Sequence, residues 1–200
     1  PGGANLNGTR TVAASGGVAT FSDLSLPTAG DYVLSVSDDS LTGATTNSFT
    51  VTAGTPATLV ITHQPLDSAA GQTLSSVTVK VEDQNGNPID GTSVTLGIAS
   101  GPTGAAIGGT TVVPTTNGIA TFGDLSFTTA GNYTLTATDG SLAAVTTDNF
   151  TVSPGAGANL AVLAQPTLGT AGQTLSPLSV SVSDQYGNPV AGALLLYTQS

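Results

Sequence analysis

The sequence has no cysteine, methionine or tryptophan among its 200 residues, and it has a single histidine. Without cysteine the chain can form no disulfide framework and carries no thiol redox chemistry. Charged residues make up only 7% of the sequence and aromatic residues only 4%. The surface must therefore be covered largely by hydroxyl groups, amides and glycine.

Basic residues are almost absent, because Arg10 and Lys80 stand against twelve acidic residues and the net charge is −10. Nucleic acids and anionic membranes both attract clusters of Lys and Arg. The composition therefore predicts neither partner. No apolar run reaches the about 18 residues of a spanning helix. The chain starts at Pro1 without a signal peptide, which indicates a processed product or an excerpt, and the composition favours export.

The sequence repeats itself. Shifted by 101 positions, it aligns with itself without a gap, and about 45 of the 99 overlapping pairs are identical. The stretch "AGQTLSSVTVKVEDQNGNP" at 70–88 falls on "AGQTLSPLSVSVSDQYGNP" at 171–189. Such a period is too long for a solenoid unit and predicts a tandem array of whole domains.

Two Gly- and Pro-bearing stretches, 53–56 and 153–157, are the expected linkers. They divide the chain into the C-terminal half of one repeat (1–54), a complete repeat (57–154) and the N-terminal half of the next (157–200). The chain starts at the equivalent of Pro102 and stops at the equivalent of Ala99. The 200 residues are therefore expected to be two repeats, circularly cut.

Alternating patterns predict strands throughout. In "SVTVKVED" the residues Val77, Val79 and Val81 alternate with polar side chains, which is the period-two signature of a half-buried strand. "NYTLTATD", "NFTV" and "TLVIT" also predict strands, and turn residues separate these stretches every 8–12 residues or so. About seven short strands per repeat predict an all-β fold of tandem immunoglobulin-like β-sandwiches. Tyr32 and Tyr133 are candidates for corner tyrosines or for ordinary core aromatics.

The order of "VTVKVEDQNGNPIDG", "GIATFGDL" and "AGNYTLTA" resembles bacterial immunoglobulin-like repeats of the invasin/intimin type. The resemblance covers essentially the whole chain. It implies an extracellular protein of the bacterial cell surface, built from tandem domains as a stalk, adhesin or fibre. It supplies no catalytic residues and no receptor.

The stretch "DQNGNPIDGTSV" is crowded with calcium-ligand types but lacks an EF-hand arrangement, because Gly86 is fourth and Val94 is twelfth. We interpret it as a turn in which Asn85 and Gly86 adopt positive φ angles and Asp83 accepts local N–H bonds. Pro88 then ends the turn. A weak interdomain calcium site at Asp38 and Asp39 is the alternative metal hypothesis.

No catalytic, cofactor or metal residue is predicted. His63 is the only histidine, and its repeat equivalent is Ala164, so it has no catalytic or metal-binding partner. The recurring acids are expected to cap turns; they are Asp23/Asp124, Asp38/Asp139 and Asp83/Asp184. An intramolecular Lys–Asn bond would have to use Lys80. The sequons at Asn7, Asn132 and Asn149 are as frequent as chance predicts.

We therefore expect a non-enzymatic structural segment of an extracellular filament, stalk or matrix fibre, without cofactors. Its partner would be itself, since each half-domain needs completion by a neighbouring repeat or subunit. The alternative is an adhesin segment that binds a host protein or surface glycan laterally. Tyr186 and Tyr197 are the only aromatic candidates for such a surface.

Overall fold

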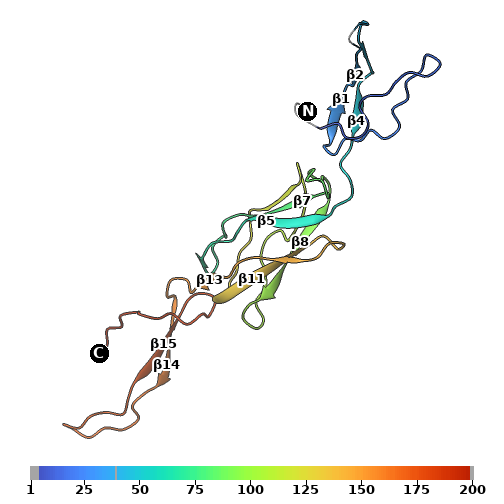
Figure 1. The fold of residues 1–200 in the computed structure, drawn as a ribbon. Helices are drawn as coiled ribbons and strands as arrows, with labels where there is room; N and C mark the ends of the chain where they lie inside the picture. The colour runs from blue at the N-terminus through green and yellow to red at the C-terminus, as the bar shows by residue number, and fades with distance from the viewer. Residues whose placement is uncertain (1–4, 39, 199–200) are drawn as a thin grey trace.

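A computed structural model describes residues 5–38 and 40–198, and every regular element among them is a β-strand. Over that part of the chain no helix is long and apolar enough to cross a membrane. The strands form three successive groups, which Figure 1 shows end to end from blue to red. We call them the N-terminal segment (5–52), the central sandwich (58–153) and the C-terminal segment (157–198).

The strands of each group are short. The N-terminal segment contains β1 (Gly30–Tyr32), β2 (Ser35–Val36), β3 (Ala44–Thr45) and β4 (Phe49–Val51). The central sandwich contains β5 (Thr58–His63), β6 (Ser68–Ala69), β7 (Val77–Glu82), β8 (Ser93–Ser100), β9 (Val112–Pro114), β10 (Ile119–Phe122), β11 (Gly131–Thr138), β12 (Val145–Thr146) and β13 (Phe150–Ser153). The C-terminal segment contains β14 (Asn159–Ala164) and β15 (Ser179–Ser183).

The central sandwich has two sheets. One has the order β10-β7-β5, and the other has the order β6-β13-β11-β8-β9, with β12 also paired to β11. The opening chain contributes to both sheets, because β5 pairs antiparallel with β7 while β6 runs parallel to β13. This is an immunoglobulin-like β-sandwich, and the expectation of an all-β fold is confirmed. The two-residue strands β6 and β12 account for the excess over the seven strands expected.

The predicted alternation determines which side chains are buried. Val77, Val79 and Val81 on β7 are 0% exposed, and the residues between them are half-buried. The inward set on β11 is as predicted, since Tyr133, Leu135 and Ala137 are all fully buried. Because successive side chains of a strand point to opposite faces, these two strands bring their apolar faces together in one core.

Of the two roles considered for Tyr133, the structure shows the corner. Its hydroxyl donates a hydrogen bond of 2.7 Å to the backbone carbonyl of Thr129. Its ring lies in the core against Phe127, at a centroid distance of 4.4 Å, and against Phe150, at 5.7 Å. The Tyr32 hydroxyl makes the same 2.7 Å bond to the carbonyl of Thr28. In both copies the tyrosine therefore fixes the turn that precedes it.

The two outer segments expose apolar side chains whose repeat equivalents are buried in the central sandwich. Leu160 on β14 is 63% exposed, whereas its equivalent Leu59 is 6% exposed. Val36 on β2 is 53% exposed, whereas its equivalent Ala137 is fully buried. The buried core extends from Leu59 to Val152. The predicted division at 54/57 and 154/157 stays a prediction.

We expect Tyr133→Phe to lower the free energy of unfolding of the central sandwich by about 0.5–1.5 kcal/mol, because it removes one buried hydrogen bond and leaves the Thr129 carbonyl without this donor. Chemical denaturation followed by circular dichroism measures the change. Tyr197→Phe is the matched control, since Tyr197 is 80% exposed. Equal stability of the two variants would contradict the corner assignment.

Candidate functional site

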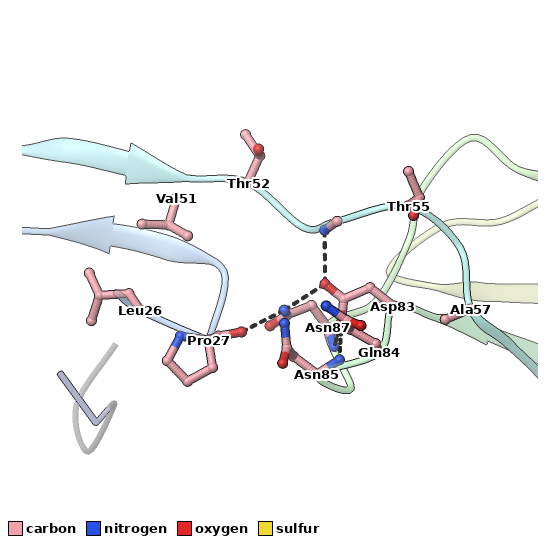
Figure 2. A pocket seen from close by; sticks show the side chains of 11 residues that line it. Leu26, Pro27, Val51, Thr52, Thr55, Ala57, Asp83, Gln84, Asn85 and Asn87 are labelled. Atoms are coloured by element: carbon pink, nitrogen blue, oxygen red, sulfur yellow. Dashed lines mark hydrogen bonds between the residues drawn. The ribbon is translucent and has the colours of Figure 1, made fainter. Parts of the chain in front are cut away.

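The most elaborate polar sites in the described residues lie at the two junctions between strand groups. At the first junction, the turn after β7 faces the linker after β4 and the turn before β1 (Figure 2). Residues from all three stretches line an open hollow of about 260 Å³, among them Pro27, Val51, Gly54, Asp83 and Asn87.

The turn at 83–87 closes the end of β7. The N–H of Gly86 donates to the carbonyl of Asp83 at 3.1 Å, and the N–H of Asp83 donates to the carbonyl of Asn87 at 3.0 Å. Gly86 has a φ of +82°, but Asn85 is not in the left-handed region, so the expectation of two positive φ angles is wrong for Asn85. The loop has three residues with glycine last, a geometry that leaves the second position open to most side chains. This explains why Tyr186 can replace Asn85 in the second copy.

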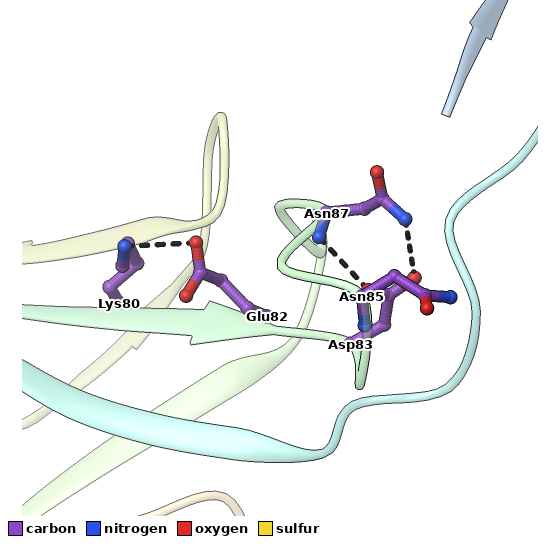
Figure 3. Close-up of polar contacts among 5 residues, drawn as sticks. All are labelled: Lys80, Glu82, Asp83, Asn85 and Asn87. Atoms are coloured by element: carbon purple, nitrogen blue, oxygen red, sulfur yellow. Dashed lines mark hydrogen bonds and ion pairs between the residues drawn. The ribbon is translucent and has the colours of Figure 1, made fainter. Parts of the chain in front are cut away.

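Asp83 organises the turn and the linker together. Its carboxylate accepts hydrogen bonds from the N–H groups of Asn85 at 2.8 Å, Asn87 at 2.9 Å and Gly54 at 2.8 Å. The expected local N–H bonds are therefore present. Figure 3 shows two bonds that Asn87 donates to Asp83, one from its backbone N–H and one from its side-chain amide. The Asn87 side-chain amide, with these N–H donors, holds the pKa of Asp83 well below its usual range despite burial. The carboxylate remains charged while it is only 3% exposed.

Asn87 joins the central sandwich to the N-terminal segment. Its side-chain oxygen accepts from the N–H of Ala29 at 2.8 Å, and its side-chain nitrogen donates to the carbonyl of Pro27 at 2.8 Å. The same nitrogen donates to Asp83 at 2.8 Å. The amide thus satisfies a backbone donor and a backbone acceptor two residues apart, as a neighbouring strand would. We call the set Gly54, Asp83 and Asn87 the first junction latch.

The latch and the corner tyrosine act on the same turn. Tyr32 holds the carbonyl of Thr28, and Asn87 holds the residues on either side of it. The tyrosine thereby preorganises the backbone groups that the asparagine of the next sandwich binds.

The second junction repeats this arrangement with Gly155, Asp184 and Asn188, which we call the second junction latch. Asn188 accepts from the N–H of Ala130 at 2.8 Å and donates to the carbonyl of Thr128 at 2.8 Å. Asp184 accepts from the N–H of Gly155 at 2.8 Å and from the side chain of Asn188 at 2.7 Å. Burial raises the pKa of Asp184, but the hydrogen bonds from Asn188, Gly155 and Tyr186 outweigh it and lower the pKa to about 2.

The second junction has an additional aromatic contact. A Cβ added at Gly71 would lie 2.2 Å from the Tyr186 hydroxyl oxygen, so the ring approaches the backbone of the central sandwich at glycine. Gly71 has a φ of +81°. Both the left-handed conformation and the close approach therefore require glycine at this position.

Sequence reasoning found the turn but missed the latch. A turn explains Asp83 and Gly86, but it does not explain why Asn87 and Gly54 have identical residues at Asn188 and Gly155. The available signal was that these two positions are identical in both copies, whereas Asn85 within the same turn is replaced by Tyr186. The partner groups on Pro27 and Ala29 are backbone atoms about 60 residues away, and no sequence pattern marks them.

The other recurring acids were expected to cap turns, and Asp38 and Asp139 do so. Asp23 and Asp124 instead accept from the N–H and hydroxyl groups of Thr9 and Thr110, 14 residues earlier in the chain, and so join two loops. Asp139 accepts from the N–H of Ser141 at 2.9 Å and the N–H of Leu142 at 2.7 Å. Asp38 accepts from Ser40 in the same way. Asp39, its predicted companion in a calcium site, lies outside the described residues.

The remaining candidates are separate from the latches. His63 is exposed at the end of β5, with Nδ1 2.7 Å from the carbonyl oxygen of Ser76. Lys80 forms an ion pair of 2.9 Å with Glu82 on the same face of β7 (Figure 3). In the described part of the chain, no three His, Cys, Asp or Glu residues are grouped so that they could hold a metal ion. The three sequon asparagines are exposed.

The fold and its latched junctions define a series of immunoglobulin-like β-sandwiches. No protein-family model and no curated protein matches the chain. Among solved structures, it is similar to surface layer protein SbsC, domains 1–6, with 21% identity and a TM-score of 0.39. It is also similar to Yersinia pseudotuberculosis InvD, with 18% identity and a TM-score of 0.48.

These similarities cover 81% of this chain and 20% of the SbsC chain, and 94% of this chain and 59% of the InvD chain. The chain thus spans less than two thirds of either structure. Similarity at this level does not determine a function.

We expect Asn87→Ala to loosen the first junction, because it removes both bonds to the N-terminal segment and leaves the half-buried backbone groups of Pro27 and Ala29 without these partners, at a cost of about 1–3 kcal/mol. Spin labels on Val33→Cys and Thr95→Cys, in a chain otherwise free of cysteine, would report a broader distance distribution. Asn85→Ala is the matched control, since the bond from residue 85 to Asp83 is made by the backbone N–H. Equal broadening in both variants would refute a specific role for Asn87.

The second junction should weaken in acid. The folded pKa of Asp184 lies below its ordinary 3.8, so the stabilisation is fully present above about pH 4 and is lost as the pH falls towards about 2. Thermal unfolding across this window should lose stability more steeply for the wild type than for Asp184→Asn, which cannot titrate there. If stability fell equally with pH in the wild type and in Asp184→Asn, the charged form of Asp184 would not be what stabilises this junction.

Proposed function

We propose that the chain is a non-enzymatic structural segment of an extracellular bacterial filament, stalk or matrix fibre. Its sandwiches lie in series, and neighbouring repeats or subunits complete its outer segments. The observation that carries the proposal is the recurrence of one latch at both junctions, with matching partners and distances. A repeated joint between repeated domains has the architecture of a linear spacer.

The latches favour a stiff spacer over a flexible string. A free Gly- and Pro-bearing linker would allow adjacent domains to reorient. Here Asp83 accepts a hydrogen bond from the linker N–H of Gly54. Asn87 in addition accepts a hydrogen bond from the N–H of Ala29 in the N-terminal segment. The bonds to Asp83 are charge-assisted and hence stronger than neutral ones. Bending at a junction would expose a buried carboxylate and its donors together.

The proposal includes no catalysis. The recurring carboxylates are engaged by backbone N–H groups and hydroxyls in turns and at junctions. Because these carboxylates act as hydrogen-bond acceptors there, we assign them a structural role. His63 is likewise occupied with the backbone of Ser76.

Lateral binding as an adhesin was the competing hypothesis, with Tyr186 and Tyr197 as its aromatic residues. Each tyrosine has a structural explanation. Tyr186 approaches Gly71 at the second junction, and Tyr197 is the repeat equivalent of Leu96, a core residue that is 2% exposed. These positions favour the structural proposal. We place such a fibre outside the cell, where it would serve as a spacer.

Small-angle X-ray scattering of the chain, at concentrations where it is monomeric, tests the proposal. The wild type should scatter as an extended rod. The double variant Asn87→Ala/Asn188→Ala should show a smaller maximum dimension, because both joints bend, while Asn85→Ala should match the wild type. A wild type as flexible as the double variant would remove the basis for a stiff spacer.

A further inference from the structure

The N-terminal segment contains an apolar groove. A hollow of about 670 Å³ is lined by side chains that include Val12, Phe21, Leu24, Leu34, Val36 and Leu41. The repeat equivalents of Phe21, Leu24 and Leu34 are Phe122, Leu125 and Leu135, which are at most 1% exposed in the core of the central sandwich. The groove is thus an inner sandwich face that is open in this structure.

The C-terminal segment exposes the complementary face. Leu178 is 41% exposed and Leu195 is 52% exposed, whereas their equivalents Val77 and Val94 are fully buried. In the central sandwich, these two sets of equivalents belong to one continuous core. The central sandwich therefore shows how the two outer segments would pack if their apolar faces met.

The edge of β4 is open at a matching place. In the central sandwich, β13 pairs with β6 in parallel, with Val152 opposite Ser68 and Ser153 opposite Ala69. In the described residues, β4 pairs only with β1. Val51 and Thr52, at the end of β4, also line the hollow at the first junction (Figure 2).

One chain cannot close this arrangement on itself. The blue strands of the N-terminal segment and the red strands of the C-terminal segment lie at opposite ends of the molecule, with the central sandwich between them (Figure 1). The partner must therefore come from a different molecule or repeat. A contact between unlike faces at opposite ends does not close and propagates linearly.

We propose that the C-terminal segment of one copy of this chain completes the N-terminal segment of a second copy in the register of the central sandwich. This inference rests on the proposed function and names its partner. By equivalence with Val77–Phe122 and Val79–Ala120, Leu178 lies opposite Phe21 and Val180 lies opposite Ala19 of the second copy. Residues 169 and 170 pair in parallel with Val51 and Thr52, and they fill the hollow at the first junction.

The register can be tested with cysteines, because the chain has none. Thr20 and Ser179 occupy the positions equivalent to Thr121 and Thr78, which lie opposite each other in the antiparallel β10–β7 pair. Such pairs have Cα separations of about 4.5–5.5 Å, within the range that a disulfide can bridge. We expect a mixture of Thr20→Cys and Ser179→Cys chains to oxidise to a covalent dimer, while each variant alone does not.

The double variant Thr20→Cys/Ser179→Cys should form a ladder of head-to-tail multimers on a non-reducing gel. Ser22→Cys/Ser181→Cys is the matched control, because these residues are four positions out of register, or about 13 Å along the strands. It should give at least tenfold less multimer. Val180→Asp should abolish cross-linking of the in-register pair while the thermal transition of the central sandwich persists.

A chain that remains monomeric at every concentration, or Thr20→Cys chains that cross-link to each other, would overturn the inference. So would equal yields from the in-register and out-of-register pairs. The proposed function is judged separately by the stiffness of the monomer. If the monomer is a rod whose stiffness depends on the latches but never cross-links, the proposed function stands and the inference fails. If the chains cross-link in register but are flexible, the pairing of the segments stands and the stiff spacer fails.

Discussion

The structure depends on a buried, charged carboxylate that is satisfied by amide groups at each junction. Asp83 and Asp184 are almost inaccessible to solvent, and a buried charge is tolerated only when it is fully hydrogen-bonded. Each carboxylate closes its own turn, holds the linker glycine and orients the asparagine that reaches the preceding unit. Turn geometry, linker path and interdomain contact are therefore one hydrogen-bonded system, and a single proton added to the carboxylate affects all three.

The latch works because the core presents its target in a fixed form. The ring of Tyr133 packs against Phe127 and Phe150, and its hydroxyl fixes the carbonyl of Thr129 between the two backbone groups that Asn188 binds. Core packing, the corner and the junction are thus linked in sequence. The rigidity of a junction is therefore expected to depend on the stability of the sandwich that precedes it.

Low charge and scarce aromatics leave few alternatives for holding such an array together. With only two basic residues, surface ion pairs cannot bind one unit to another, and exposed ion pairs contribute little in any case. The junctions instead use backbone groups and amides, and the outer segments present apolar faces whose equivalents form the core of the central sandwich. Cohesion along the array then depends on strand pairing, apolar burial and the latches.

The sequence by itself determined the repeat, the all-β class and the alternation that buries Val79 and Leu135, and it marked Tyr32 and Tyr133 as corner candidates. These features are local or recur at a fixed period, so hydrophobic pattern and turn chemistry specify them. It also placed the turn at 83–87, although it misassigned the conformation of Asn85. Only the tertiary structure decided what Asn87 does, because its partners are backbone atoms of a unit about 60 residues earlier. Backbone atoms have no residue identity, so no sequence motif can mark them as a binding partner.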